Sequence, residues 1–308
     1  MNVDKPRDGG VLYISYICIH SSDMATTHLP ASTLIISVYK NVEFLKVILN
    51  ALAFQTHLPD EIIISEDGNS LEMADFIAHY ETDLPLKHST QEDHGWQKNK
   101  ALNSAIKRAT FEYLIFIDGD CVLHPKFIEN HLKLAHPKEI QAGKRIKLGP
   151  SYSAIVKSEP LTSFERRIWK ETSSIKKDGA KFYEEAIYIP LNGFTKPIIR
   201  LAGISSIKGC NFSCYRNALI DINGFDEDYI RPAIGEDIDL VWRFKGLGYK
   251  ICSIKHFAVQ YHLDHPESWI SQEENSALMK SKQSSKLYRC YNGLIDERKA
   301  TMFHTTEA

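Results

Sequence analysis

The stretch YLIFIDGD, residues 113–120, joins an apolar run to two acids that are separated by one glycine. Five strand-forming residues in a row predict a strand that is buried on both faces. Asp118 and Asp120 lie at its end, two positions apart, so their side chains point to the same side. Gly119 lets a ligand approach the backbone closely. Paired carboxylates suit Mg²⁺ or Mn²⁺, particularly when a phosphate completes the coordination shell. The stretch therefore predicts a site for a phosphate-bearing donor.

The composition is that of an ordinary globular chain. Of the 308 residues, 43% are hydrophobic and 25% are charged, which suits one large domain or two modest ones. The net charge of −2 gives no reason to expect nucleic acid as a partner. The six cysteines are scattered, and Cys210 and Cys214, the only close pair, lack the further ligands of a zinc module. Free thiols in a reducing, cytoplasmic setting are expected.

The beginning of the chain carries no clear targeting signal. No apolar run reaches the ~20 residues that cross a bilayer. Residues 11–19 are apolar, but no basic cluster precedes them and no small-residue cleavage pattern follows. We expect residues 1–30 to form a loosely ordered extension. A cytoplasmic location is expected, and peripheral contact with the inner face of a membrane is compatible with the sequence.

Strands and helices alternate through the first half of the chain. Strands are expected at 33–38, 61–65, 86–89 and 113–117, and helices at 41–53, 72–80, 99–109 and 125–135. Uniformly apolar strands alternating with amphipathic helices predict an α/β fold with a mostly parallel sheet flanked by helices. Ligands bind such sheets beyond the carboxyl ends of the strands. Tyr39, the pair Glu66-Asp67 and the acids after residue 117 all lie at such ends.

The second half of the chain has a less regular pattern. We expect one or two strands in 141–156, helices with a mobile loop in 157–200, a strand at 207–215 and helices at 216–222 and 235–245. A strand pair is expected at 249–254 and 256–261, followed by a polar helical segment and a frayed end.

Six segments, taken in order, resemble family-2 glycosyltransferases of the GT-A fold. They are ISVYKN (36–41), PDEIIISEDGN (59–69), NKALNSAI (99–106), YLIFIDGDCVLHP (113–125), GCNFSCYRNALIDINGFDEDY (209–229) and GEDIDLVWRFKGLGYK (235–250). The last two look like a galactosyltransferase-type acceptor region. The resemblance implies a nucleotide-sugar-binding half at 31–140 and an acceptor-binding, catalytic half at 141–266, between the extension 1–30 and a helical tail at 267–308.

The resemblance also implies the reaction and its cofactor. It implies an inverting glycosyltransferase that moves a hexose or N-acetylhexosamine from a UDP-sugar to a glycan or lipid-linked acceptor, in surface polysaccharide synthesis. Asp118-Gly119-Asp120 would be its DxD motif, with Asp120 on Mn²⁺ or Mg²⁺ and Asp118 near the metal or the ribose. His262, or His265 as the alternative, would be a further metal ligand.

An inverting reaction needs a base that takes the proton of the acceptor hydroxyl. Glu236 and Asp237 open an expected helix, where backbone N–H groups stabilise anions and lower the pKa of a carboxylate. The match to the family motif assigns Asp237 as the base and Glu236 as a group that binds or orients the acceptor. Asp239 is expected to be a solvated residue on the helix surface.

Further residues are candidates for contacts with the nucleotide. Tyr39 would lie against the base or pack in the fold. Glu66, where most relatives have aspartate, would accept a hydrogen bond from the uracil N3–H. Asp67 would hold the turn. Lys98 and Lys100 would meet phosphate or remain plain surface charge.

Two tryptophans could offer a flat face to a sugar ring. Trp96 precedes the expected helix at 99–109, and Trp242 lies in the same expected helix as the base. Trp242 would contact the acceptor or pack in the core.

Two other functions fit part of the sequence. Residues 117–122 match the strand–DxDx[TV] signature of haloacid-dehalogenase-type phosphatases, with Asp118 as nucleophile. That signature would stand after two strand–helix units instead of near the chain start, and it leaves Glu236 and Asp237 unused. A catalytically dead carbohydrate-binding module is the other alternative, although it has no need of the intact acids.

Overall fold

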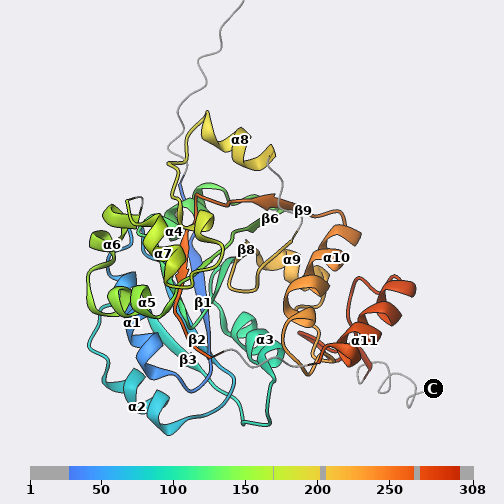
Figure 1. Cartoon of the computed structure of the whole chain (residues 1–308). Coiled ribbons are helices and arrows are strands. Elements are labelled where there is room, and N and C mark those ends of the chain that lie inside the picture. Colours follow the sequence, from blue (N-terminus) through green and yellow to red (C-terminus); the bar gives the residue numbers. More distant parts are fainter. Residues whose placement is uncertain (1–27, 169, 202–205, 267–270, 299–308) are drawn as a thin grey trace, which may run out of the picture.

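The computed structural model describes residues 28–298, except for 169, 202–205 and 267–270. The expected N-terminal extension lies almost wholly outside these described residues. The described chain forms a seven-stranded sheet in the order β3-β2-β1-β4-β8-β6-β9 and a smaller sheet in the order β5-β10-β7 (Figure 1). The predicted α/β fold with a mostly parallel sheet is confirmed.

The first half follows the sequence pattern closely. Its elements are β1 Ser32–Val38, α1 Val42–Leu52, β2 Glu61–Glu66, α2 Leu71–His79, β3 Leu86–Ser89, α3 Lys98–Arg108 and β4 Tyr113–Asp118. The strands β2, β1 and β4 lie side by side and parallel, with Ser37 opposite Ser65 on one side and opposite Asp118 on the other. The carboxyl ends of the three strands therefore meet at one edge of the sheet.

The second half departs from the expected pattern in several places. Its elements are β5 Cys121–Leu123, α4 Phe127–Lys133, β6 Glu139–Ala142, β7 Ile146–Lys147, α5 Pro150–Ser158, α6 Leu161–Ile168, α7 Thr172–Lys177, the 3-10 helix η1 Tyr183–Ala186, α8 Thr195–Leu201, β8 Asn211–Tyr215, α9 Arg216–Asp221, the π-helix η2 Ile234–Ile238, α10 Asp239–Gly246, β9 Lys250–Ser253, β10 Gln260–His262 and α11 Glu273–Ser284. The strand expected up to residue 156 is wrong, because Pro150 starts a helix, a position that its fixed φ favours.

The predicted strand pair near residue 255 is also wrong. The strands β9 and β10 belong to different sheets, since β9 pairs with β6 and β10 pairs with β5 and β7. Between them His256 has a left-handed backbone conformation with φ 68°, which turns the chain away from a hairpin. The strand β8 runs antiparallel to both of its neighbours, β4 and β6.

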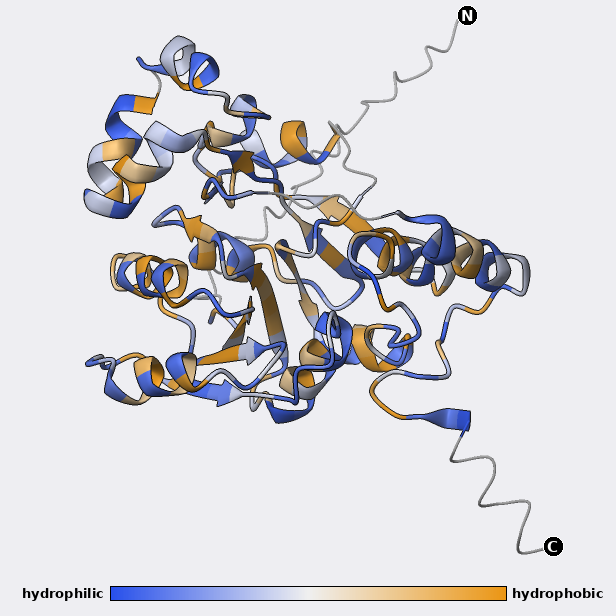
Figure 2. Ribbon diagram, turned by 60° about the horizontal axis from the view of Figure 1, so that its bottom comes forward, coloured by the Kyte–Doolittle hydropathy of each residue, from blue (hydrophilic) through white to orange (hydrophobic). Residues whose placement is uncertain are grey.

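Both faces of the large sheet are covered by helices. Leu34 and Ile36 pack on the face that α1 covers, whereas Ile35 packs on the opposite face with Leu102 of α3. All four side chains are buried, as expected for strands with no polar face. Figure 2 shows the apolar strands enclosed between the helices. None of the helices in the described residues combines the length and apolar character that a bilayer crossing requires.

A buried ion pair fixes α10. Asp239 is fully buried, so the expectation of a solvated surface acid is wrong. Its carboxylate accepts a hydrogen bond of 2.6 Å from Nε of Arg243, which is also fully buried. Arg243 Nη1 donates to the carbonyl oxygens of Ile222 and Gly224 at 2.9 and 2.8 Å. The helix that follows Glu236 and Asp237 is thereby tied to the turn after α9.

The substitution Arg243→Ala tests this anchor. It leaves the Asp239 carboxylate buried without its cation, which should lower the free energy of unfolding by about 3–5 kcal/mol in urea denaturation. The matched control Arg108→Ala, at an exposed position of α3, should cost less than about 1 kcal/mol. Equal effects of the two substitutions would show that the buried pair does not hold the helix.

Candidate active site

A cavity of about 520 Å³ opens at the carboxyl ends of β1, β2 and β4. Its lining includes residues from all three strand ends and from the loop before α3. The lining residues are Ser37, Val38, Tyr39, Asn41, Phe44, Asp67, Gly95, Trp96, Lys98, Asp118, Gly119, Asp120 and His265. The cavity therefore lies at the sheet edge where the sequence predicted a ligand site.

Gly119 is required by close packing at the floor of this cavity. Its N–H donates to the carbonyl oxygen of Ser37 at 2.7 Å. A Cβ at this position would lie 2.7 Å from Val38 Cγ1 and 2.9 Å from the Ser37 carbonyl oxygen. Both distances are shorter than packed atoms adopt, so a side chain would push Asp118 and Asp120 away from β1.

Lys98 joins the two acidic clusters of the sequence. Its Nζ lies 2.8 Å from Asp118 Oδ1 and 2.6 Å from Glu236 Oε2. Burial opposes the charge on Lys98, but the two carboxylates outweigh it and raise the pKa of Lys98 well above its ordinary value. Acids that are far apart in the chain, at the end of β4 and in η2, therefore face the same small volume.

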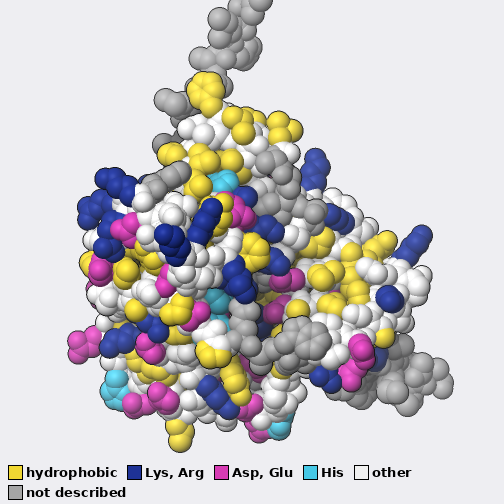
Figure 3. Space-filling view, viewed as in Figure 1, with side chains coloured by type: hydrophobic (Ala, Val, Ile, Leu, Met, Phe, Trp, Pro, Cys, Tyr) yellow, Lys and Arg dark blue, Asp and Glu magenta, His cyan; other side chains and the backbone are white. Residues whose placement is uncertain are grey.

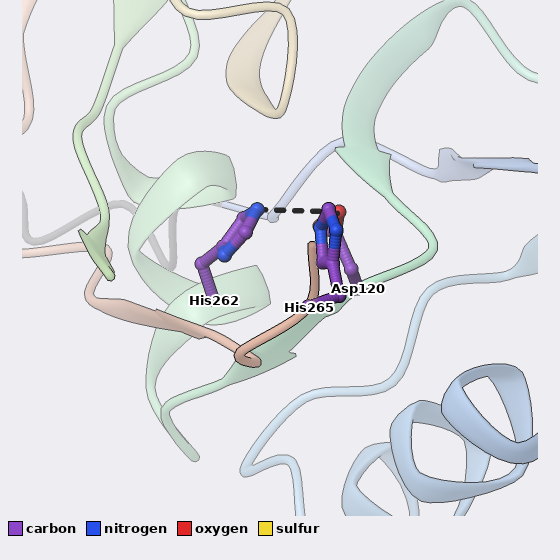
Figure 4. Close-up of side chains that lie close together, drawn as sticks. All are labelled: Asp120, His262 and His265. Atoms are coloured by element: carbon purple, nitrogen blue, oxygen red, sulfur yellow. Dashed lines mark hydrogen bonds and ion pairs between the residues drawn. The ribbon is translucent and has the colours of Figure 1, made fainter. Parts of the chain in front are cut away.

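Asp120, His262 and His265 form a compact group beside the cavity, and two of them, Asp120 and His265, line it. Figure 4 shows both imidazoles near the Asp120 carboxylate, with Nε2 of His262 and His265 at 3.3 and 3.2 Å from Oδ2. The pairing of β10 with β5 produces this arrangement, because it puts His262 opposite Cys121. Burial alone would raise the pKa of Asp120, but hydrogen bonds with the two histidines hold it well below its usual range.

The composition of this group suits a divalent metal ion. The three ligand atoms, one carboxylate oxygen and two imidazole nitrogens, lie within 4.8 Å of one another. Carboxylate and imidazole ligands together fit Mn²⁺. The structure brings both candidate histidines to Asp120, whereas Asp118 is engaged by Lys98 and lies 3.6 Å from Arg145 Nη1.

Asp237 lies in the π-helix η2, which follows Ala233 with its positive φ of 83°. The backbone N–H of Gly209 donates to Oδ1 at 2.5 Å, and Lys208 Nζ lies 3.5 Å from Oδ2. Burial and then the neighbouring charge of Glu236 raise the pKa of Asp237 above its ordinary value. The expected lowering by a helix N-terminus is therefore wrong for Asp237.

The other candidates of the first half divide between the cavity and its surroundings. Tyr39 stands at the rim, 53% exposed, and donates to Asp93. Asp67 lines the cavity and accepts hydrogen bonds of 2.8 Å from the Gln97 N–H and from Gln91 Nε2, and burial raises its pKa. Asp67 thus ties the end of β2 to the loop before α3.

Two of the residues predicted to contact the nucleotide do not line the cavity. Glu66 is fully buried, and its two oxygens contact the Ser70 N–H and His88 Nε2, both at 2.9 Å. Lys100 is exposed. The structure therefore provides Glu66 with internal partners instead of a cavity position.

The two tryptophans have different surroundings. Trp96 lines the cavity. Trp242 donates from Nε1 to Asp239 at 3.3 Å and to Met279 Sδ at 3.1 Å, and its ring lies 4.9 Å from that of Tyr288. Trp242 thus packs α10 against the C-terminal segment and is not part of the cavity lining.

Sequence reasoning missed two basic residues beside the acids, Arg145 and Lys208. Arg145 lies in the stretch where one or two strands were expected, and no strand end was predicted at residue 145. Lys208 directly precedes the GCNFSCY segment, but nothing in its spacing distinguishes it from a surface lysine. Their positions depend on the contacts between distant segments.

The fold and the site together define a protein of the GT-A glycosyltransferase class. A family model described as glycosyl transferase family 2 matches residues 33–190, just over half of the chain. The chain therefore belongs to glycosyl transferase family 2. A second model, described as the N-terminal domain of galactosyltransferase, matches residues 188–266. The family and the fold that the sequence motifs predicted are confirmed.

Similar sequences include two kinds of bacterial enzyme. Validoxylamine A glucosyltransferase of Streptomyces hygroscopicus subsp. limoneus is 25% identical over 242 residues, covering 73% of this chain and 50% of that protein. Poly-beta-1,6-N-acetyl-D-glucosamine synthase of Staphylococcus aureus (strain COL) is 25% identical over 243 residues, covering 77% of this chain and 51% of that protein. The chain thus spans about half the length of these relatives.

Two solved structures share the fold at 16% identity. The mannosyltransferase PcManGT from Pyrobaculum calidifontis, in complex with GDP-Man and Mn²⁺, has a TM-score of 0.53 and covers 85% of this chain and 64% of that one. S. aureus TarS 1–349, in complex with UDP-GlcNAc, has a TM-score of 0.53 and covers 87% of this chain and 69% of that one.

The substitution Gly119→Ala tests the packing of the cavity floor. The added Cβ should displace Asp120, and loss of such support around a metal ligand costs about 10–100-fold in metal affinity. Titration with Mn²⁺, followed by the paramagnetic resonance of the free ion, should show this loss. Gly193→Ala, at a position where a Cβ meets no atom within 4 Å, should leave Mn²⁺ affinity unchanged. Equal affinity in both variants would contradict the proposed constraint.

Proposed function

We propose that this protein is an inverting, divalent-metal-dependent glycosyltransferase. It transfers a hexose or N-acetylhexosamine from a UDP-sugar to a glycan or lipid-linked acceptor, at the cytoplasmic face of a membrane when the acceptor is lipid-linked. The observation that carries the proposal is the Lys98 contact with both Asp118 and Glu236, because it puts the donor cavity beside the acids of η2. Family membership and the polysaccharide synthases among the relatives support a role in surface polysaccharide synthesis.

The donor is proposed to occupy the cavity at the sheet edge. Tyr39 at its rim would lie against the nucleobase, and Trp96 offers an aromatic face within the lining. Asp120, His262 and His265 would hold Mn²⁺ or Mg²⁺. A divalent ion there would neutralise the charge that develops on the diphosphate leaving group. Apart from the two histidines, the proposed donor residues lie in 31–140, and residues 141–266 would supply the acceptor site and the base.

Asp237 is proposed as the general base. It would take the proton of the acceptor hydroxyl while the hydroxyl oxygen bonds to the anomeric carbon and the nucleoside diphosphate leaves with the electron pair of the broken bond. Its raised pKa makes the carboxylate a stronger base than an ordinary aspartate. The N–H of Gly209 and the ammonium of Lys208 hold it in place, and Glu236 would orient the acceptor.

The alternatives from the sequence gain no support. Asp118, the nucleophile of the phosphatase interpretation, is paired with Lys98 and lies beside Arg145. The family match covers the DxD segment and the strand–helix units before it. A dead binding module would not need a partly buried Asp237 whose pKa is raised.

The substitution Asp237→Asn tests the proposed base. With Mn²⁺ and a panel of UDP-sugars, wild-type protein should release UDP, and kcat of the variant should fall by about 10²–10⁴-fold because proton transfer is lost. The Kd of UDP should stay within severalfold of wild type. The exposed control Asp75→Asn on α2 should retain full activity. Wild-type kcat should decline on the acid side around an apparent pKa above 3.8, the ordinary value for aspartate.

Several results would contradict these assignments. Strong loss of UDP binding in Asp237→Asn would place this residue on the donor instead of the acceptor. Release of phosphate from an aryl phosphate, without UDP release from any nucleotide sugar, would favour the phosphatase. An acid limb at or below the ordinary aspartate value would exclude Asp237 as the titrating base.

A further inference from the structure

Basic side chains gather on the acceptor side of Asp237, outside the donor cavity. Lys208 lies next to this carboxylate, and Lys144 Nζ donates to Ser206 Oγ at 2.8 Å. Lys144 is close enough to two cations, Lys208 and Lys255, and to two carboxylates, Glu185 and Asp237, for their charges to act on it. Figure 3 shows lysine and arginine side chains close to acidic ones around the hollow in the middle of the face.

Most of these cations have a carboxylate partner. Lys208 pairs with Asp237 and Lys255 pairs with Glu185 at 3.2 Å. Lys98 and Arg145 both face acids, as described above. Lys144 differs, because among the described residues its ammonium forms no ion pair and contacts only a neutral hydroxyl.

The surroundings of Lys144 destabilise an ammonium group that has no carboxylate partner. Its side chain is partly buried, and burial together with the like charge of Lys208 lowers the pKa of Lys144, although the carboxylates of Glu185 and Asp237 act in the opposite direction. An ammonium that is partly removed from water gains free energy when an anion binds to it. The Lys144 carbonyl accepts a hydrogen bond of 2.8 Å from Asn211 Nδ2, so its backbone is fixed to β8 beside the site.

The position of Lys144 separates it from the donor. The cavity lining includes Lys98 but neither Lys144 nor Lys208. Lys208 contacts the proposed base directly. Lys144 contacts Ser206, which lies two positions before Lys208 in the chain. An anion on Lys144 would therefore sit on the acceptor side of Asp237.

We propose that the acceptor carries an anionic group, a phosphate or a carboxylate, that binds Lys144 with support from Lys208. This inference rests on the proposed function, because it names the acceptor class of the same site. A phosphate would come from a phosphorylated polyol or lipid, and a carboxylate from an acidic sugar. Both would place a charged acceptor with a hydroxyl next to Asp237.

Lysine labelling tests the proposal without a known substrate. Wild-type protein is treated with an amine-acylating reagent, and modification of individual lysines is measured by mass spectrometry. Glycerol 3-phosphate or methyl β-glucuronide should slow modification of Lys144 by about tenfold, as expected for a charge-assisted contact. Neutral methyl β-glucoside should not slow it. Exposed Lys280 on α11 should react equally throughout.

Comparing the ligands distinguishes the possible sources and the possible failures. Protection by glycerol 3-phosphate alone identifies a phosphate acceptor, and protection by the glucuronide alone identifies an acidic sugar. UDP with Mn²⁺ should leave Lys144 reactive, and UDP binding is measured in parallel by equilibrium dialysis. Failure of UDP to bind would count against the donor site, independently of the Lys144 result. Lys144 that reacts equally with every ligand, or that only UDP protects, would overturn the inference.

A pair of variants provides a second measurement. With a UDP-sugar that turns over, the KM of a neutral acceptor should exceed that of a matched anionic acceptor, and this KM advantage of the anionic acceptor should fall about tenfold in Lys144→Met. Lys280→Met should preserve the advantage. An unchanged advantage in Lys144→Met would contradict the inference.

Discussion

The site depends on one ammonium group between two carboxylates. Asp118 and Glu236 come from different halves of the chain, and two negative charges at such short range would repel each other without a cation between them. Lys98 supplies that cation from the start of α3, with contacts of 2.8 and 2.6 Å. The contact ties the donor cavity to η2. The distance between the proposed donor and acceptor sites therefore depends on the attraction of one ammonium group for two carboxylates.

The remaining parts of the site are held by backbone pairing and burial. The small sheet brings His262 and His265 to Asp120, because β10 pairs with β5 immediately after the DxD segment. On the other side, the buried pair of Asp239 with Arg243 anchors the helix that follows Asp237. Each acid of the site thus has a distinct electrostatic environment, which lowers the pKa of Asp120 and raises that of Asp237.

The sequence predicted the elements whose signal is local. Uniformly apolar strands predicted the first half of the sheet, because a strand that is buried on both faces has few polar residues. The polar residues at the ends of these strands predicted the position of the cavity. The environment of individual acids could not be predicted in this way. Asp239 was expected at the helix surface, whereas the structure buries it in an ion pair with Arg243, one helical turn away. Exposed ion pairs use the same spacing, so the spacing alone does not reveal the burial. Lys144 and Arg145 acquire their roles only when β6, β7 and β8 are assembled.

The most direct test of this account is the position of manganese in crystals grown with UDP and Mn²⁺, located by its anomalous scattering. One peak is expected within coordination distance of Asp120, His262 and His265, with the uridine in the cavity that Lys98 and Tyr39 line. A peak away from these three side chains, or a nucleotide bound outside the cavity, would contradict the proposal that the donor and its metal ion bind at this edge of the sheet.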